Sequence, residues 1–220
     1  MVADGRLRHI EGSGRSLHLN PSATPQFTNT PGQVAFSPDG SQLIVTTKAN
    51  GDNIDVFSVA GDGTLSSHFV ANNEPNEVPF AIAFNPAGDL VIAESASTSA
   101  VATFTLHANG TVTQLNQVAT TQAATCWVVA DNAALFTSNA GSGSVTRLTS
   151  DAAGHLTLLG QTSTDPGTVD ATVSPQGRYL YVQTGANGIV DEFQVDHGNL
   201  TKIGSVTVAG AAGGEGIAAA

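Results

Sequence analysis

The sequence predicts an all-β protein of the β-propeller class, with four complete four-stranded blades and one further blade strand at each end. A hairpin of two apolar strands around a Pro-x-Gly turn recurs at residues 34–45, 82–92 and 171–182, and in a reduced form at 127–136. A second turn follows each hairpin, with its glycine at residues 63, 110, 154 and 198, in steps of 47, 44 and 44 residues. Four short strands with tight turns in a unit of about 45 residues are typical of a propeller blade.

The repeat sets the expected blade boundaries, and the composition is that of a folded protein. Of the 220 residues, 40% are hydrophobic and 11% are charged, which excludes the composition of a disordered chain. We expect a single propeller domain over residues 1–220. The predicted blades span residues 31–70, 78–118, 123–161 and 168–207, after a leading strand and loop at 1–30 and before a trailing strand at 208–220.

The two ends predict incomplete blades. Asp4–Ile10 matches the second turn and last strand of a blade, and Gly214–Ala218 resembles the opening strand of another. An arc of blades leaves sheet edges and apolar faces uncovered. We therefore expect an open chain that self-associates through its open blade edges, unless further blades precede it.

The net charge, the hydrophobicity and the cysteine content limit the partners and bonds that we expect for this protein. The net charge is −11, from 18 acidic against 7 basic residues, and such a surface repels nucleic acid. No stretch is long and apolar enough for a membrane-spanning helix, and the first residues lack the order of a signal peptide. We expect a cytoplasmic protein that binds neither nucleic acid nor membrane. Cys126 is the one cysteine, so it forms no intrachain disulfide or thiolate metal site.

Blade topology predicts where a site lies. The first strand of a blade starts, and the second strand ends, on the same face of the ring, so residues far apart in sequence meet there. Lys48, Glu94, Asn139 and Asp170 are predicted to surround one channel mouth of this kind. Glu94 is the strongest candidate, because an acidic residue that ends a strand of Leu-Val-Ile-Ala has no packing purpose.

Other residues near this mouth have two interpretations. Asp170 either binds substrate or accepts backbone amides between neighbouring blades, and Asn139 either binds substrate or orders its own Gly-Ser turn. Phe80 and Trp127 open inner strands and are expected to contact substrate. His18, in the long leading loop, is a weaker catalytic candidate. We interpret Cys126 as a buried, inert thiol.

Several segments of the sequence together resemble one family: Phe36–Gly40, Val78–Phe80 with Ala83–Phe84, Cys126–Val129, Ser138–Gly143 and Gly216–Ala219. The resemblance is to the bacterial lactonase family of seven-bladed propellers, which includes 6-phosphogluconolactonase-like proteins and 3-carboxymuconate cyclases.

The resemblance implies that the chain corresponds to the later blades of an incomplete seven-bladed ring. It also implies a channel-mouth site that hydrolyses or forms a small-molecule lactone such as 6-phosphogluconolactone. Glu94 would then be the general base and Lys48 would stabilise charge on the ring carbonyl. The sequence departs from the family at Thr47, where a glutamate is frequent, and few arginines are present to hold a carboxylated substrate.

Two other functions stay open. The first is a non-catalytic propeller that serves as a binding or scaffold module. The second is a metal-dependent lactonase in which Glu94, Asn139 and Asp170 bind Ca²⁺ through oxygen ligands. Apart from that alternative, no cofactor is expected, and no histidine pair has the spacing of a metal site.

Overall fold

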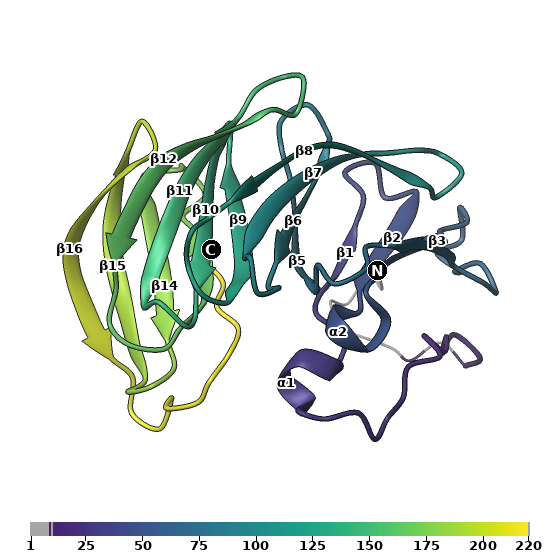
Figure 1. Ribbon diagram of the computed structural model, residues 1–220, viewed down its shortest axis with the longest axis horizontal. Coiled ribbons are helices and arrows are strands. Elements are labelled where there is room, and N and C mark those ends of the chain that lie inside the picture. The colour runs from purple at the N-terminus through teal and green to yellow at the C-terminus, as the bar shows by residue number, and fades with distance from the viewer. Residues whose placement is uncertain (1–8, 10, 220) are drawn as a thin grey trace.

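The computed structural model describes residues 9 and 11–219, which form four antiparallel sheets of four strands each (Figure 1). Within each sheet the strands pair in chain order, as in propeller blades. The first blade has β1 (Val34–Phe36), β2 (Gln42–Thr46), β3 (Asn53–Ser58) and β4 (Val70–Asn73). The second has β5 (Pro79–Phe84), β6 (Leu90–Glu94), β7 (Ala100–Leu106) and β8 (Val112–Ala119). The third has β9 (Thr125–Asp131), β10 (Ala134–Asn139), β11 (Ser144–Ser150) and β12 (Leu156–Ser163), and the fourth has β13 (Thr168–Val173), β14 (Tyr179–Thr184), β15 (Ile189–Asp196) and β16 (Asn199–Thr207).

The turns between outer strands show why the repeat keeps its glycines. Gly110 lies in the turn before β8 with φ of +86°, a conformation that side chains with a Cβ rarely adopt. A Cβ on Gly110 would also lie 3.0 Å from Cγ2 of Val70 in the preceding blade. The turn therefore requires glycine for its own geometry and for the contact between blades.

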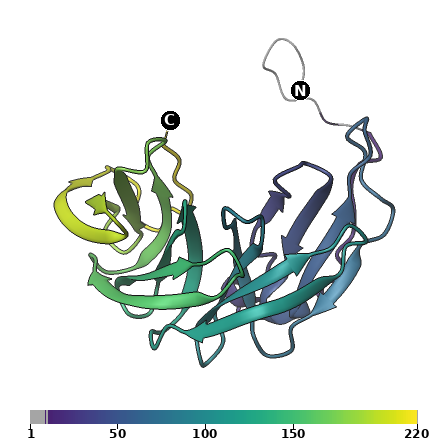
Figure 2. The ribbon, with the colours of Figure 1, turned by 90° about the horizontal axis from the view of Figure 1, so that it is seen from above.

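The four blades lie side by side in chain order and form an arc, with β1, β5, β9 and β13 as the inner strands (Figures 1 and 2). An apolar core fills each of the three interfaces between blades. Ile44 and Ile92 belong to the first core, Val91 and Leu135 to the second, and Phe136 and Leu180 to the third. Burying such side chains contributes roughly 1.5–3 kcal/mol each, so these interfaces hold the arc together.

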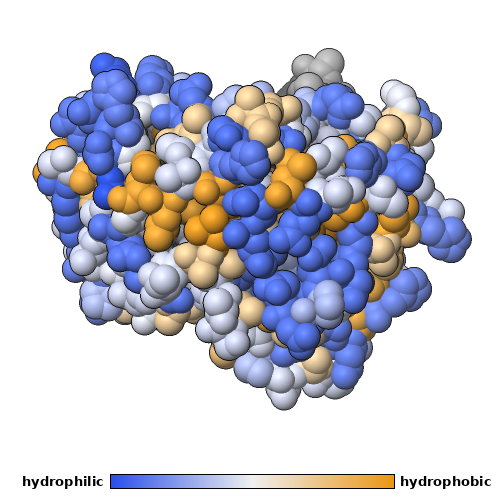
Figure 3. Space-filling model, turned by 45° about the horizontal axis from the view of Figure 1, so that its top comes forward, coloured by the Kyte–Doolittle hydropathy of each residue, from blue (hydrophilic) through white to orange (hydrophobic). Residues whose placement is uncertain are grey.

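The first blade has one face that no other described blade covers. Val34 and Phe36 of β1 are 59% and 58% exposed. Ile82, which holds the position of Val34 in the second blade, is buried in the first core. Elsewhere, apolar surface forms patches among hydrophilic residues (Figure 3). The predicted self-association through open blade edges stays a prediction.

Two short helices and the terminal segments complete the fold. The helices α1 (Gln26–Asn29) and α2 (Lys48–Gly51) lie on the same side of the first blade (Figure 1). The predicted leading strand at residues 4–10 falls, apart from His9, outside the described residues. The predicted trailing strand is not formed: residues 214–219 have no strand hydrogen bonds, because no described strand pairs with them. In residues 9 and 11–219 no helix is long and apolar enough to cross a bilayer.

Candidate functional site

The ends of the second strands and the starts of the first strands meet, as predicted. Glu94 at the end of β6 pairs with Pro79 at the start of β5, and Asn139 of β10 pairs with Thr125 of β9. The residue after each second strand therefore lies at one mouth of the channel. Ser95 and Ala140 directly follow β6 and β10, and Lys48 follows β2 after Thr47, whose backbone N–H still bonds to β3; all three line one cavity of about 370 Å³. We call it the mouth cavity.

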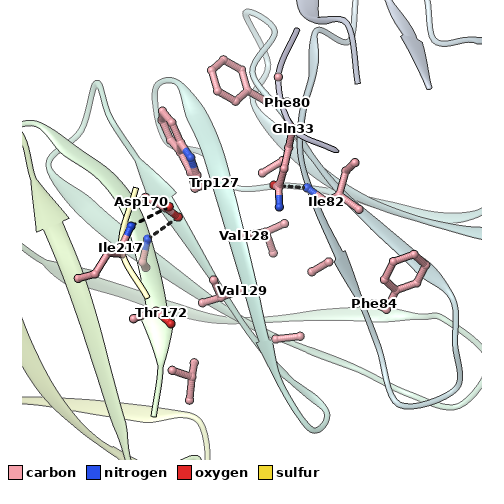
Figure 4. A pocket seen from close by; sticks show the side chains of 16 residues that line it. Gln33, Phe80, Ile82, Phe84, Trp127, Val128, Val129, Asp170, Thr172 and Ile217 are labelled. Carbon is pink, nitrogen blue, oxygen red and sulfur yellow. Dashed lines mark hydrogen bonds between the residues drawn. The ribbon is translucent and has the colours of Figure 1, made fainter. Parts of the chain in front are cut away.

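The mouth cavity adjoins a second cavity that follows the inner strands. This second cavity, the channel, has a volume of about 560 Å³ and is lined by residues of β5, β9 and β13 (Figure 4). Phe80 and Trp127 line both cavities, so they mark the junction between them. In the channel, Gln33 points toward β5 and its side-chain oxygen accepts the backbone N–H of Ile82 at 2.9 Å.

Lys48 contributes a positive charge to the mouth cavity. Its Nζ donates to the backbone oxygen of Phe27 at 2.9 Å and to Oγ1 of Thr30 at 3.1 Å. Nζ also lies 4.2 Å from the centre of the Phe80 ring, within the range of a cation–π contact. Burial lowers the pKa of Lys48, while Glu215 and Cys126 oppose that change. An ammonium group has three N–H donors, so one remains for a ligand in the cavity.

Aromatic side chains form one wall of the mouth cavity. The rings of Phe80 and Trp127 have centres 5.0 Å apart and are inclined at 57°. Both residues were predicted to contact substrate, and both line the cavity. Flat apolar ring faces of this kind can pack against the ring of a small cyclic ligand.

Cys126 also borders the mouth cavity. Its Sγ lies 3.3 Å from Oγ of Ser95, and only 7% of the residue is exposed. Burial raises the pKa of the thiol, which keeps it protonated at neutral pH. These features agree with the interpretation of Cys126 as a buried, inert thiol.

The C-terminal segment supplies a carboxylate that the sequence reasoning missed. Glu215 lines the mouth cavity from residues 214–219, a segment that belongs to no described strand. Asp170 holds this segment: its Oδ2 accepts the backbone N–H of Ile217 at 3.3 Å, and its Oδ1 accepts that of Ala171 at 2.8 Å (Figure 4). Both oxygens of Asp170 thus accept backbone amides, but from its own strand and the C-terminal segment rather than from a neighbouring blade. Burial, and to a lesser extent Glu215, raise the pKa of Asp170.

Glu94 lies at the strand end beside the mouth, but its side chain does not face the mouth cavity, contrary to the sequence prediction. It is 1% exposed, lines neither cavity, and lies on the face of β6 that carries Leu90 and Ile92 toward the first blade. One oxygen, Oε2, accepts Nε2 of Gln117 at 2.7 Å, and Oε1 has no hydrogen-bond partner in the described part of the chain. Burial raises the pKa of Glu94 to about 8; the Gln117 hydrogen bond opposes this, and Glu77 and Glu74 add to it.

Asn139 is likewise turned away from the mouth. Its Oδ1 accepts Oγ1 of Thr125 at 2.7 Å, and its Nδ2 donates to Oγ of Ser144 and Oγ1 of Thr146. These bonds order the strands around it, so its polar atoms are occupied within the third blade.

The proposed Ca²⁺ ligands do not converge. Glu94 faces the first blade, Asn139 is held within the third, and Asp170 lies in the channel. In the described part of the chain, no three His, Cys, Asp or Glu side chains are close enough together to hold a metal ion.

His18 lies outside the mouth cavity. It is exposed and borders a separate hollow formed by the leading segment, with its ring centre 6.2 Å from that of Phe69. The sequence prediction placed His18 in the long leading loop on the mouth side; in the structure this loop carries His18 to Phe69, which directly precedes the outer strand β4.

Comparison with known proteins identifies the class to which this fold and mouth belong. A model of the family described as lactonase, 7-bladed β-propeller, matches residues 13–129 and 94–215. The chain therefore belongs to the lactonase family of seven-bladed β-propellers. A comparison with curated proteins found no match.

Solved structures show the same fold at low sequence identity. A putative 6-phosphogluconolactonase from Bacteroides uniformis has a TM-score of 0.73 at 20% identity, and one from Bacteroides fragilis has 0.71 at 22%; each match covers 86% of this chain. The periplasmic gluconolactonase of Pseudomonas aeruginosa has 0.68 at 22%, over 89% of this chain. The chain spans 58% of the length of each of these three proteins.

Proposed function

We propose that the protein hydrolyses a small-molecule lactone in the mouth cavity. The observation that supports this proposal most is that Lys48 and Glu215, a cation and a carboxylate, line one cavity with an aromatic wall. Membership of the lactonase family makes a cyclic ester the first ligand to consider.

In this proposal the lactone ring packs against Trp127 and Phe80, with its carbonyl oxygen toward Lys48. The remaining N–H of Lys48 donates to that oxygen and stabilises the negative charge that develops on it. Glu215 takes a proton from a water molecule as the water oxygen bonds to the carbonyl carbon. The ring C–O bond of the tetrahedral intermediate then breaks, and the leaving oxygen receives the proton from Glu215, which gives the open-chain hydroxy acid.

Burial of Lys48 serves this role in two ways. Its bonds to Phe27 and Thr30 fix the ammonium group before substrate enters, so little reorganisation is needed during the reaction. The low exposure of the residue also strengthens its interaction with a developing charge.

Glucono-δ-lactone hydrolysis tests the proposal. The acid produced is followed with a pH indicator and compared with spontaneous hydrolysis in the same buffer. We expect Lys48→Met to lower kcat/KM about 100-fold, since one oxyanion donor is worth roughly 10²–10³ in rate. Arg147→Met is the matched control, because Arg147 donates to Asn199 outside both cavities, and it should keep full activity.

The outcomes separate an enzyme from a binding module. Hydrolysis that is no faster than in buffer, from a protein that melts cooperatively, would contradict catalysis and favour the non-catalytic alternative. Equal loss of activity in the Lys48 and Arg147 variants would contradict the role of Lys48.

A further inference from the structure

The described residues that line the mouth cavity and the channel carry more negative than positive charge. Lys48 is the one described lysine or arginine that lines the mouth cavity or the channel, whereas Glu215 and Asp170 contribute two carboxylates. The other described cations have partners elsewhere. Arg15 donates to the backbone oxygens of Leu65 and Ser66, Arg147 to Asn199, and Lys202 to Asp165 and Asp191, while Arg178 lies over the ring of Tyr179.

Lys48 is poorly suited to hold a phosphate group. Two of its three donors are bound to the neutral oxygens of Phe27 and Thr30, and its charge faces the Phe80 ring. A phosphate of charge near −2 is ordinarily held by several donors or by bidentate arginines. One free N–H matches the single carbonyl oxygen of a lactone instead.

We propose that the mouth cavity selects an uncharged lactone, the cyclic ester of a neutral sugar acid, and disfavours a phosphorylated one. This inference rests on the proposed function for the location of the substrate. Glu215 on the cavity wall, with Asp170 beyond it, repels a phosphorylated ring, whereas the hydroxyl groups of a neutral sugar can donate hydrogen bonds to carboxylates. The net charge of −11 adds a long-range repulsion for anions.

Trp127 allows a binding test that is independent of turnover. It is the one tryptophan in the chain and lines the mouth cavity, so its fluorescence reports on occupancy there. The probes are glucono-δ-lactam, a ring amide that replaces the reactive ester, and its 6-phosphate. We expect the neutral lactam to bind at least tenfold more tightly at low ionic strength. Added salt should tighten binding of the phosphate but leave the neutral lactam unchanged, because salt screens charge repulsion.

A charge added at the cavity should relax this selectivity. Thr28 lines the mouth cavity and has no role in the proposed chemistry. We expect Thr28→Lys to improve binding of the phosphorylated lactam about tenfold and to leave the neutral one within twofold. Thr28→Gln is the control of similar size without charge, and it should leave both affinities unchanged.

The two hypotheses fail in different ways. Equal or tighter binding of the phosphorylated lactam by the unsubstituted protein, or no binding of either lactam, overturns the selectivity. Faster hydrolysis of 6-phosphoglucono-δ-lactone than of glucono-δ-lactone also overturns it and leaves lactone hydrolysis standing. Preferential binding of the neutral lactam without turnover of either lactone supports the selectivity and contradicts the proposed function.

Discussion

Replacing Glu94 with glutamine is expected to stabilise the protein at pH 9 by on the order of 4 kcal/mol and to raise Tm by about 10 °C. The reason is that burial raises the pKa of Glu94 from 4.5 to about 8 in the folded protein. An ionised carboxylate in this position has one buried oxygen without a partner in the described residues, and Glu77 and Glu74 repel it. Glutamine has nearly the same shape but no charge to bury.

The pH range follows from the direction of the shift. Below about pH 4.5 Glu94 is protonated in both the folded and the unfolded chain, so it does not affect stability there. Between pH 4.5 and about 8 the unfolded chain loses this proton and the folded chain keeps it, so stability falls as pH rises. Above about pH 8 both states are ionised and the full penalty remains. Asp55, whose pKa burial raises to about 6, adds to the fall between pH 4 and 6.

Thermal or urea unfolding from pH 4 to pH 9 measures this effect. The Glu94→Gln variant and the unsubstituted protein should coincide near pH 4 and separate as pH rises. Glu192→Gln, on β15 of the fourth blade, is the matched control and should follow the unsubstituted protein. A stability difference that does not depend on pH would contradict this account.

The same variant tests the catalytic role that the sequence predicted for Glu94. Because Glu94 lines neither cavity, we expect Glu94→Gln to retain lactone hydrolysis within about twofold. Loss of hydrolysis in a variant that is well folded at pH 7 would restore Glu94 as the general base and contradict the role proposed for Glu215.

Replacing Glu215 with glutamine is expected to lower kcat about 1000-fold with little change in Tm. General-base catalysis contributes typically 10²–10⁴ in rate, and glutamine cannot take a proton from water. Glu215 is exposed on the C-terminal segment, so its replacement should not disturb an apolar core. Steady-state hydrolysis of glucono-δ-lactone measures the loss, and Glu192→Gln again serves as the control. Activity within tenfold of the unsubstituted protein would contradict the proposed role of Glu215.

The repeat made the fold predictable, because its turns and apolar strands are local features of the sequence. The blade order, the inner strands and the meeting of strand ends at one mouth all follow from that repeat. Lys48, Phe80 and Trp127 were correctly placed at this mouth for the same reason.

The predicted site was wrong at Glu94 and Asn139 because the direction of a side chain changes with a shift of one residue along a strand. Successive side chains of a strand point to opposite faces, and in a blade these two faces pack against the preceding and the following blade: Ile82 belongs to the first core and Ala81 to the second. A polar residue inside a second strand is therefore buried between blades, whereas a residue beyond the strand end can reach the mouth. The backbone N–H of Thr47 donates to the backbone oxygen of Asn53, the first residue of β3. Glu94 pairs in the same way with the first residue of β7, so Thr47 is the equivalent of Glu94 in the first blade. Lys48 is then the equivalent of Ser95. The sequence prediction grouped Glu94 and Asn139 with Lys48 at the mouth, but these two are the last residues of β6 and β10 and are buried beside it.

Glu215 was missed for a different reason. It lies outside the repeat, in a segment that the sequence predicted to be a strand. The alternating side-chain directions of a strand do not apply to this segment, because a hydrogen bond to a side chain holds it in place. The contact of Ile217 with Asp170, 47 residues away, determines its position. The run Gly214-Glu215-Gly216 was the one available indication, since a lone acidic residue among glycines and alanines has no packing role.

A crystal structure of the protein with glucono-δ-lactam would show whether the mouth cavity is the lactone site. We expect the lactam ring to pack against Trp127 and Phe80, with its carbonyl oxygen about 3 Å from Nζ of Lys48 and its carbonyl carbon facing Glu215. A lactam bound outside the mouth cavity, or bound inside it with no contact between its carbonyl oxygen and Lys48, would contradict the account.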